Sequence, residues 1–236
     1  MVILAVTGFV IAWLYYGSIN RSVDPRIKQA QIMYGRYNVF VSENDFDKVL
    51  NLLDSIKAIY AAIPHYANSY EMGVMENNRA SVFLTIALSD TVLHEIRQNY
   101  FALAEHHLNK SIDYYNAWMS FYENKTEEEI LVVVENEFAP DASLMHHANL
   151  DAIIKNRVGE IKTAQIETPR RLSVSYSNLG IIMRHENRLD EAIDYYTKAL
   201  ELWEDNMAAK NNLNIIFGKP LEKQSILRKL FPPDRK

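Results

Sequence analysis

The sequence predicts an all-helical protein, and three observations support this fold class. The chain of 236 residues contains only 7 Gly and 7 Pro, too few for the frequent tight turns of an all-β fold. Apolar residues recur at helical spacing over long stretches, and no segment shows the alternation of a strand ladder. Several capping side chains stand before acidic first turns, a pattern typical of helix starts.

The composition excludes several classes of function. A net charge of −5 provides no basic field that would attract nucleic acid, so we expect no nucleic-acid partner. There are no cysteines, which excludes disulfides, thiol catalysis, thiolate metal sites and lipidation at Cys. Because 48% of the residues are hydrophobic, the chain can still build a sizeable core.

The first 17 residues predict a transmembrane anchor that contacts the lipid bilayer. Residues 1–16 carry no charged side chain, and a helix of that length covers about 25 Å, close to the thickness of a hydrocarbon core. Trp13, Tyr15 and Tyr16 stand where an aromatic belt meets the headgroups. Two alternatives stay open. One is a cleaved signal peptide, although this segment lacks the basic start and the cleavage site that such peptides usually have. The other is a core helix that the rest of the protein covers on every side.

The orientation of this anchor rests on weaker signals. Arg21, Arg26 and Lys28 follow the apolar run and favour a cytoplasmic body, although Asp24 dilutes them. A bacterial signal-anchor with an exported body is the commoner design. We therefore expect a single-pass membrane protein whose body is periplasmic or otherwise extracytoplasmic.

The N-terminal half predicts helices separated by short connections. After a polar linker over residues 18–24, Pro25 suits the first position of a helix that reaches about Phe40. Residues 42–45 supply a cap and acidic charges for a second helix, which Pro64 ends. Residues 65–99 predict one long helix or two nearly collinear ones meeting near residues 73–78, and residues 100–122 predict another.

The C-terminal half continues the helical pattern. Thr126 and the three glutamates after it predict a helix start, because a hydroxyl cap and carboxylates complement the positive end of the helix dipole. That helix stops at Pro140. Residues 144–165 predict a helix with a weak point at Gly159, and Thr168-Pro169 predicts the start of the next one. In all we expect about ten helices.

Residues 173–206 resemble one tetratricopeptide repeat (TPR) unit. Small residues stand at its eighth, twentieth and twenty-seventh positions, where two helices approach closely, and large ones stand at the positions that fill the space between hairpins. Met183 and Glu204 depart from the usual aromatic residue and the usual proline. The matching residues are Tyr176, Leu179, Gly180, Ala192, Tyr196 and Ala199.

Weaker copies flank this unit. A partial repeat begins at Met207 and is cut off at Gly218. Upstream, Ala104, Leu108, Ser111 and Ile112 align with Ala192, Tyr196, Ala199 and Leu200, and a first hairpin carries Gly35. The resemblance implies an α-solenoid, a TPR-like array of helical hairpins. It divides into degenerate hairpins (residues 25–126), inserted helices (127–168), the clear unit with the partial repeat (169–218), and a C-terminal capping helix and tail (219–236).

The resemblance also implies where a partner binds. The ligand groove of this family is lined by first-helix side chains, which here are Val174, Ser177, Ile181, Arg184 and His185, with Asn211 in the following copy. Family members that capture chaperone tails use lysine and asparagine where this chain has Ser177 and Ile181. We therefore expect an amphipathic or extended partner segment instead.

No catalytic, cofactor or metal site is predicted. His106-His107 and His146-His147 are adjacent pairs that point about 100° apart on a helix, so neither can chelate as an i, i+4 pair does. The sequence has no glycine-rich phosphate loop and no nucleophile elbow. An enzyme would need a buried cluster of titratable side chains, and the sequence reveals none. We expect a protein that is not an enzyme.

Two functions follow from these predictions. The first is a membrane-anchored scaffold that binds protein partners in an envelope complex, with a homo-oligomer as a further possibility. The alternative is an exported ligand-binding accessory protein, for example one associated with a transporter, with an apolar cavity among the middle helices in residues 65–159. A sealed pocket would favour the accessory protein, and an open groove would favour the scaffold.

Overall fold

The computed structural model describes residues 22–223, which are helical with no strand. The predicted anchor over residues 1–17 and most of the predicted C-terminal capping helix lie outside this range. Within it, no helix is long and apolar enough to cross a membrane. The described helices are α2 (Lys28–Tyr34), α3 (Tyr37–Ser42), α4 (Phe46–Ala61), α5 (Pro64–Ala67), α6 (Tyr70–Ala87), α7 (His94–Tyr122), α8 (Glu127–Phe138), α9 (Leu150–His185), α10 (Leu189–Leu202) and α11 (Met207–Ile216).

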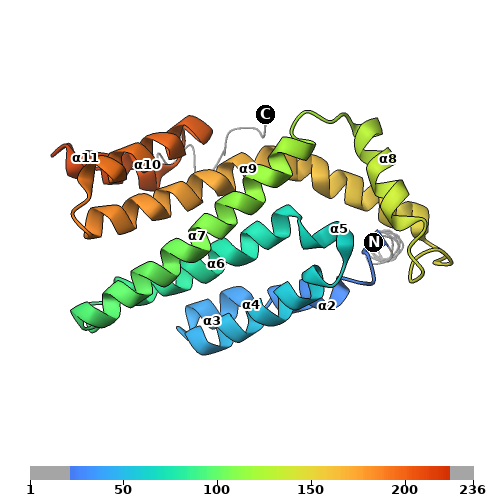
Figure 1. Cartoon of the computed structure of the whole chain (residues 1–236), viewed down its shortest axis with the longest axis horizontal. Helices are drawn as coiled ribbons and strands as arrows, with labels where there is room; N and C mark the ends of the chain where they lie inside the picture. The colour runs from blue at the N-terminus through green and yellow to red at the C-terminus, as the bar shows by residue number, and fades with distance from the viewer. Residues whose placement is uncertain (1–21, 224–236) are drawn as a thin grey trace, which may run out of the picture.

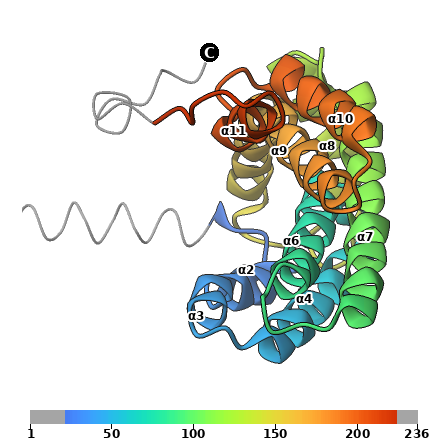
Figure 2. The same cartoon turned by 90° about the vertical axis from the view of Figure 1, so that its left-hand side faces the viewer.

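The helices stack as antiparallel hairpins in an arc (Figures 1 and 2). Helices α6 and α7 form one hairpin, and α9 and α10 form another that packs against it. In Figure 2, α2, α6, α9 and α11 lie toward one side of the arc, called the inner side here, while α4, α7 and α10 lie toward the outer side. This alternation of first and second helices is the arrangement expected of a helical-repeat array.

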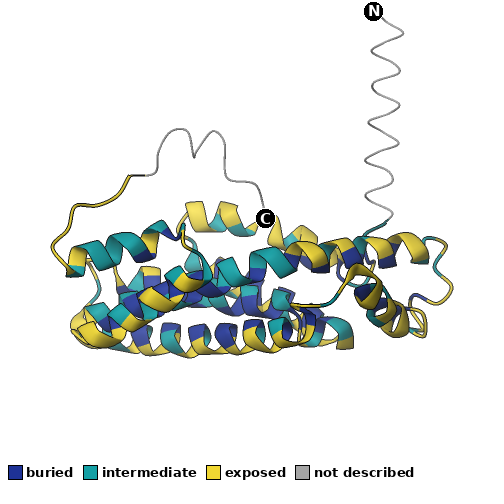
Figure 3. Cartoon of the chain, turned by 90° about the horizontal axis from the view of Figure 1, so that it is seen from above, coloured by how far each residue is buried: buried dark blue, intermediate teal, exposed yellow. Residues whose placement is uncertain are grey.

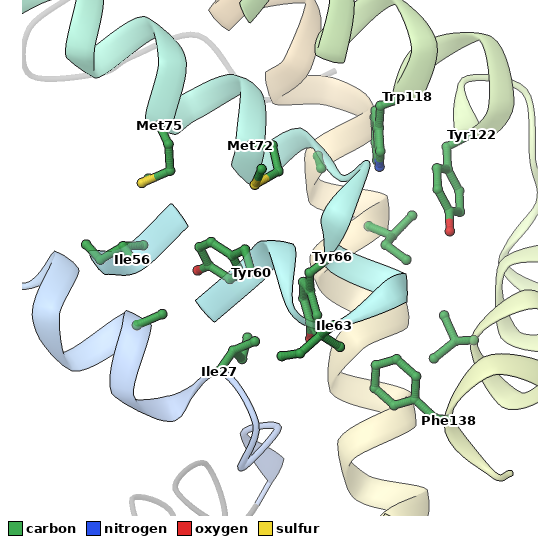
Figure 4. Close-up of a cluster of buried hydrophobic side chains, with 14 of the residues drawn as sticks. Ile27, Ile56, Tyr60, Ile63, Tyr66, Met72, Met75, Trp118, Tyr122 and Phe138 are labelled. Atoms are coloured by element: carbon green, nitrogen blue, oxygen red, sulfur yellow. The ribbon is translucent and has the colours of Figure 1, made fainter. Parts of the chain in front are cut away.

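Two buried clusters form the core. The first joins α2, α4, α5 and α8 to parts of α6 and α7 and to the N-terminal half of α9. It includes Tyr66, Trp118 and Phe138 (Figure 4). The second joins the remaining parts of α6, α7 and α9 to α10 and α11. Exposed residues lie on the outward faces of the same helices (Figure 3). Because α6, α7 and α9 contribute to both clusters, these three helices connect the two halves of the body.

Several helix starts agree with their sequence signals. Asp45 caps α4, where its Oδ1 accepts the backbone N–H of Lys48 at 3.2 Å. Thr126 and Glu129 form a capping box at α8: the Thr126 hydroxyl oxygen accepts the Glu129 N–H, and the Glu129 carboxylate accepts the Thr126 N–H. Two otherwise unpaired backbone donors are thereby satisfied.

Other predicted boundaries are wrong. The helix expected from Pro25 to Phe40 is two short helices separated at Gly35 and Arg36. The break expected near residues 73–78 falls instead between α6 and α7, after Leu88, and α7 begins at His94 rather than near residue 100. Gly73 lies inside α6, where its lack of a side chain admits the Tyr115 ring. A glycine that serves close packing was therefore mistaken for a helix break.

The helix start expected at Thr168-Pro169 is also wrong. Helix α9 runs through both residues as one helix of 36 residues, about 54 Å long. The predicted boundary between residues 168 and 169 falls inside it. Ala164 and Leu172 on either side of the proline are buried in different core clusters. Burial of both halves of α9 thus outweighs the missing proline N–H.

The end of the predicted linker belongs to the folded body. Asp24 is 4% exposed and accepts hydrogen bonds from Arg26 and from the Tyr66 hydroxyl. Arg26 also pairs with Asp141 at 2.6 Å and lies over the Phe138 ring. Arg26 is therefore a structural residue rather than a free charge flanking the apolar segment.

Candidate functional site

The interface between α9 and α10 is built around one glycine and one tyrosine. A Cβ added at Gly180 would lie 2.6 Å from Cε1 of Tyr196, so the ring rests directly on the α9 backbone. Ala192, Tyr196 and Ala199 have no exposed surface. The small and large positions predicted from the repeat pattern therefore meet as expected, and the two helices approach closely.

Polar contacts extend this interface to α11. The Ser173 hydroxyl donates to the Ala199 carbonyl at 2.6 Å. The Asn206 side-chain amide donates to the Ser173 hydroxyl oxygen at 2.9 Å, while its carbonyl oxygen accepts the Ala209 N–H at 3.1 Å. Asn206 therefore caps α11 and ties that helix to α9, which sets the position of the next first helix.

The predicted groove residues on α9 have different exposures. Val174, Ile181 and Arg184 are partly buried, and Ile181 packs against the second core cluster. Ser177 is 2% exposed and its hydroxyl has no hydrogen-bond partner within residues 22–223. His185 is exposed, although its ring lies 5.8 Å from the Phe101 ring of α7 and partial burial lowers its pKa. Val174, Ile181, Arg184 and His185 thus remain within reach of a partner, whereas Ser177 does not.

Asn211 on α11 holds a segment of the same chain. Its side-chain amide donates to the Glu222 carbonyl at 3.1 Å, and its carbonyl oxygen accepts the Glu222 N–H at 2.8 Å. One side chain therefore pairs with both the backbone N–H and the backbone carbonyl of Glu222. Neither bond involves the Glu222 carboxylate, so the contact recognises main chain rather than a particular side chain.

Residues 174–202 match the family model for the tetratricopeptide repeat. This segment is a tetratricopeptide repeat. Comparison with curated proteins gave no match. The match covers the second half of α9 and α10, the elements whose glycine, alanine and tyrosine positions form the interface described above.

The hairpin of α6 and α7 repeats the central contact of the tetratricopeptide unit. A Cβ at Gly73 would lie 2.5 Å from Cε1 of Tyr115, and the same three ring atoms are nearest in both hairpins. The Ser111 hydroxyl donates to the Gly73 carbonyl at 2.9 Å. The counterpart of Tyr196 is therefore Tyr115. The predicted alignment of Tyr196 with Leu108 is wrong: Leu108 lies on the same buried face of α7, about two helical turns before Tyr115.

A buried ionic cluster lies among α5, α6, α8 and α9, and the sequence did not predict it. Arg157 is 2% exposed. It donates to Glu71 at 3.3 Å, to Glu160 at 3.0 Å and to Nε2 of His65 at 2.8 Å. His65 contacts Glu137 through its other ring nitrogen. The only sequence signal is the i, i+3 spacing of Arg157 and Glu160, which also occurs on many exposed helices.

The surroundings of His65 define its protonation state. Because the Arg157 guanidinium donates to Nε2, that nitrogen must carry the lone pair, and the proton sits on Nδ1 toward Glu137. Burial lowers the pKa of His65. Burial would raise the pKa of Glu71, but the Arg157 charge and hydrogen bond lower it below its ordinary value. The cluster is therefore held with neutral histidine and ionised carboxylate.

A second buried carboxylate lies between α4, α6 and α7. Glu76 is 1% exposed, pairs with Lys57, and contacts Nδ1 of His107 at 2.6 Å. Burial acts to raise its pKa, but the bonds to His107 and Lys57 lower it from 4.5 to about 2. Within residues 22–223 no group of His, Asp and Glu side chains could hold a metal ion.

Proposed function

We propose that this protein is a membrane-anchored scaffold that binds protein partners through α9 and α11 within an envelope complex. The observation that carries the proposal is the contact between Asn211 and the Glu222 backbone beside a tetratricopeptide repeat. A side chain that pairs with both groups of a peptide residue suits an extended segment of any sequence. Ile181 and Arg184 on α9 supply the apolar and charged contacts for selectivity.

The groove proposal is tested by crosslinking and pull-down of the full chain from native membranes. Ile181→Glu and Arg184→Glu should each reduce capture of the partners seen with the wild-type protein. Val132→Glu is the matched control, because Val132 is an apolar residue of α8 that is 55% exposed and lies outside the groove. Circular dichroism establishes that each variant is folded. An unchanged set of partners in both groove variants would contradict the proposal.

The membrane part of the proposal rests on the uncharged segment over residues 1–16. The pairing of Arg26 with Asp24 and Asp141 removes one charge from the cluster that would retain the body in the cytoplasm, which supports an extracytoplasmic body. Deletion of residues 2–17 should release the protein from the membrane fraction. Alkaline phosphatase fused at the C-terminus should be active, since that enzyme works only outside the cytoplasm; an inactive fusion would reverse the orientation.

A role without catalysis is part of the proposal. The cluster around His65 supplies the titratable groups that an enzyme needs, but Nε2 of His65, the atom that would act as a general base, is occupied by Arg157. Glu71 and Glu160 are engaged by the same guanidinium. These groups therefore neutralise one another, as expected of a structural ion cluster.

The scaffold is favoured over the ligand-binding accessory protein by the lining of the pockets near the middle helices. The pocket beside His65 has a volume of about 220 Å³ and includes Glu137 and Arg157, and another of about 370 Å³ is lined by Lys57, Glu76 and Asp113. Charged side chains within both linings do not suit the wholly apolar cavity that the alternative requires.

A further inference from the structure

A pocket of about 450 Å³ lies between α6 and α9, the two inner helices at the centre of the arc (Figure 2). It is separate from the groove of α9 and α11 described above. Tyr70 of α6 forms one wall, and residues of α9 from Lys155 to Arg171 form the other. The glycine at position 159 and two cationic side chains determine what this pocket can hold.

Arg171 provides a hydrogen-bond donor without an acceptor. Its guanidinium carbon lies 5.1 Å from the centre of the Tyr70 ring, which fixes the orientation of the group. Its Nη1 is buried and has no hydrogen-bond partner within residues 22–223. This nitrogen is closed to solvent, so a ligand acceptor would reach the guanidinium through the part of the Arg171 side chain that lines the pocket.

Lys155 lines the other end of the pocket. It is exposed and has no ion pair among the described residues. The neighbouring Arg157, by contrast, is fully engaged by Glu71, Glu160 and His65 and cannot contribute. Along a helix the Cα atoms of Lys155 and Arg171 are about 24 Å apart, so a single carboxylate cannot reach both. The two cations therefore match an elongated ligand with acidic groups toward both ends.

Gly159 keeps the middle of the pocket open. It lies inside α9, where glycine is less favourable than alanine, yet a Cβ added there would meet nothing within 4 Å. Packing therefore does not require the glycine, in contrast to Gly73 and Gly180. An open surface at this position leaves room for the main chain of a ligand that runs along the helix.

We propose that this pocket binds an extended acidic segment of a partner protein, with one carboxylate on Arg171, the main chain beside Gly159 and a second carboxylate near Lys155. The inference deepens the proposed scaffold function by giving the charge of a partner segment and a second place where it binds. Charge complementarity supports it. Arg171 and Lys155 line the pocket without an ion pair among the described residues, whereas the carboxylate of Glu160 is already paired with Arg157.

The test is a titration of the full-length chain, in neutral detergent, with a blocked peptide that carries two glutamates separated by three small residues. The side-chain Nε–H resonance of Arg171, assigned by its loss in Arg171→Lys, should shift saturably. The analogue with two glutamines should produce no such shift. Inorganic phosphate should compete poorly, since a compact anion contacts one end only. Equal binding of the glutamine analogue, or equal competition by phosphate, would overturn the proposal.

Two variants at one position separate binding from folding. Gly159→Leu should abolish the shift while leaving the protein at least as stable, because leucine favours the helix and fills the pocket. Gly159→Ala should retain binding within about twofold. If Gly159→Leu binds the peptide as the wild type does, the ligand lies elsewhere. If the wild-type chain does not bind the peptide but still captures its partners from membranes, this inference alone is overturned. If the wild-type chain binds the peptide but captures no partner, the scaffold function is contradicted.

Discussion

At the scale of single residues, the three glycines within α6 and α9 have different physical roles. Gly73 and Gly180 each lie under a tyrosine ring, so a methyl group would collide with Tyr115 or Tyr196. Gly159 faces open space. The same residue type thus serves close helix approach at two positions and an open surface at the third.

This difference predicts opposite effects of alanine. Gly180→Ala should lower the free energy of unfolding by about 1–3 kcal/mol, because the added methyl group overpacks a closed interface. Gly159→Ala should raise it by up to about 1 kcal/mol through helix propensity alone. Urea unfolding followed by circular dichroism measures both. If Gly180→Ala proves neutral, the ring of Tyr196 does not rest on the backbone as described.

The pH dependence of stability separates two buried groups. Burial lowers the pKa of His65 below its ordinary value of 6.5, so the unfolded chain binds a proton that the folded chain does not. The free energy of unfolding should therefore fall as the pH drops below about 6.5. For Glu76, whose pKa is lowered from 4.5 to about 2, the loss should occur between those two values.

Two substitutions assign these phases. His65→Gln should reduce the decrease that begins near pH 6.5, to which His185 also contributes, and keep the one below pH 4.5. Glu76→Gln should reduce the decrease below pH 4.5, to which Glu71 also contributes, and keep the one near pH 6.5. The measurement is the urea midpoint as a function of pH. Loss of both phases in either variant would show that the two groups are coupled rather than independent.

The residues of the tetratricopeptide unit were predictable because their types follow directly from packing. Gly180, Ala192 and Tyr196 stand at positions where size alone decides what fits. The roles of Arg157 and Arg171 were not predictable, since a buried arginine and an exposed one look alike in the sequence. Only the fold shows that Arg157 is engaged by three side chains, whereas Nη1 of the partly buried Arg171 has no hydrogen-bond partner among residues 22–223.

At the scale of helices, local signals predicted where several elements begin but not how long they continue. Thr126 and Asp45 act within one helical turn, and both caps are present. The continuation of α9 through Pro169 depends on contacts with α6, α7, α8 and α10, which no local signal contains. Long helices held by burial on both sides of a weak point are therefore the elements that sequence patterns divide wrongly.

Pro169 offers a test of that explanation. Pro169→Ala should stabilise the protein, by at most about 3 kcal/mol, because alanine restores the N–H that the proline lacks and removes a steric conflict with the preceding turn. Thermal unfolding measures the change, and Ala152→Gly, at an exposed position in the first turn of the same helix, should show the opposite sign. A destabilised Pro169→Ala protein would mean that the proline is required for the course of α9.

At the scale of the whole molecule, the two core clusters share α6, α7 and α9 rather than meeting at a linker. One tetratricopeptide hairpin cannot cover its own apolar faces. Here the hairpin of α6 and α7 covers one side of it and α11 the other. The groove and the α6–α9 pocket thus both lie on helices whose positions depend on the complete stack.

Sharing of helices predicts that the body unfolds as one unit. Ile161 and Ile182 both lie on α9 and have no exposed surface, but Ile161 belongs to the first cluster and Ile182 to the second. Each change to alanine should cost about 2–5 kcal/mol and should shift a single transition. Circular dichroism follows all helices, while the fluorescence of Trp118, measured in a background with Trp13 and Trp203 changed to Phe, follows the first cluster. The two signals should coincide in the wild type and both variants, since α9 cannot remain folded in one cluster after losing the other. If Ile182→Ala instead shifts circular dichroism to lower urea but leaves the Trp118 signal in place, the two clusters are independent and α9 does not couple them.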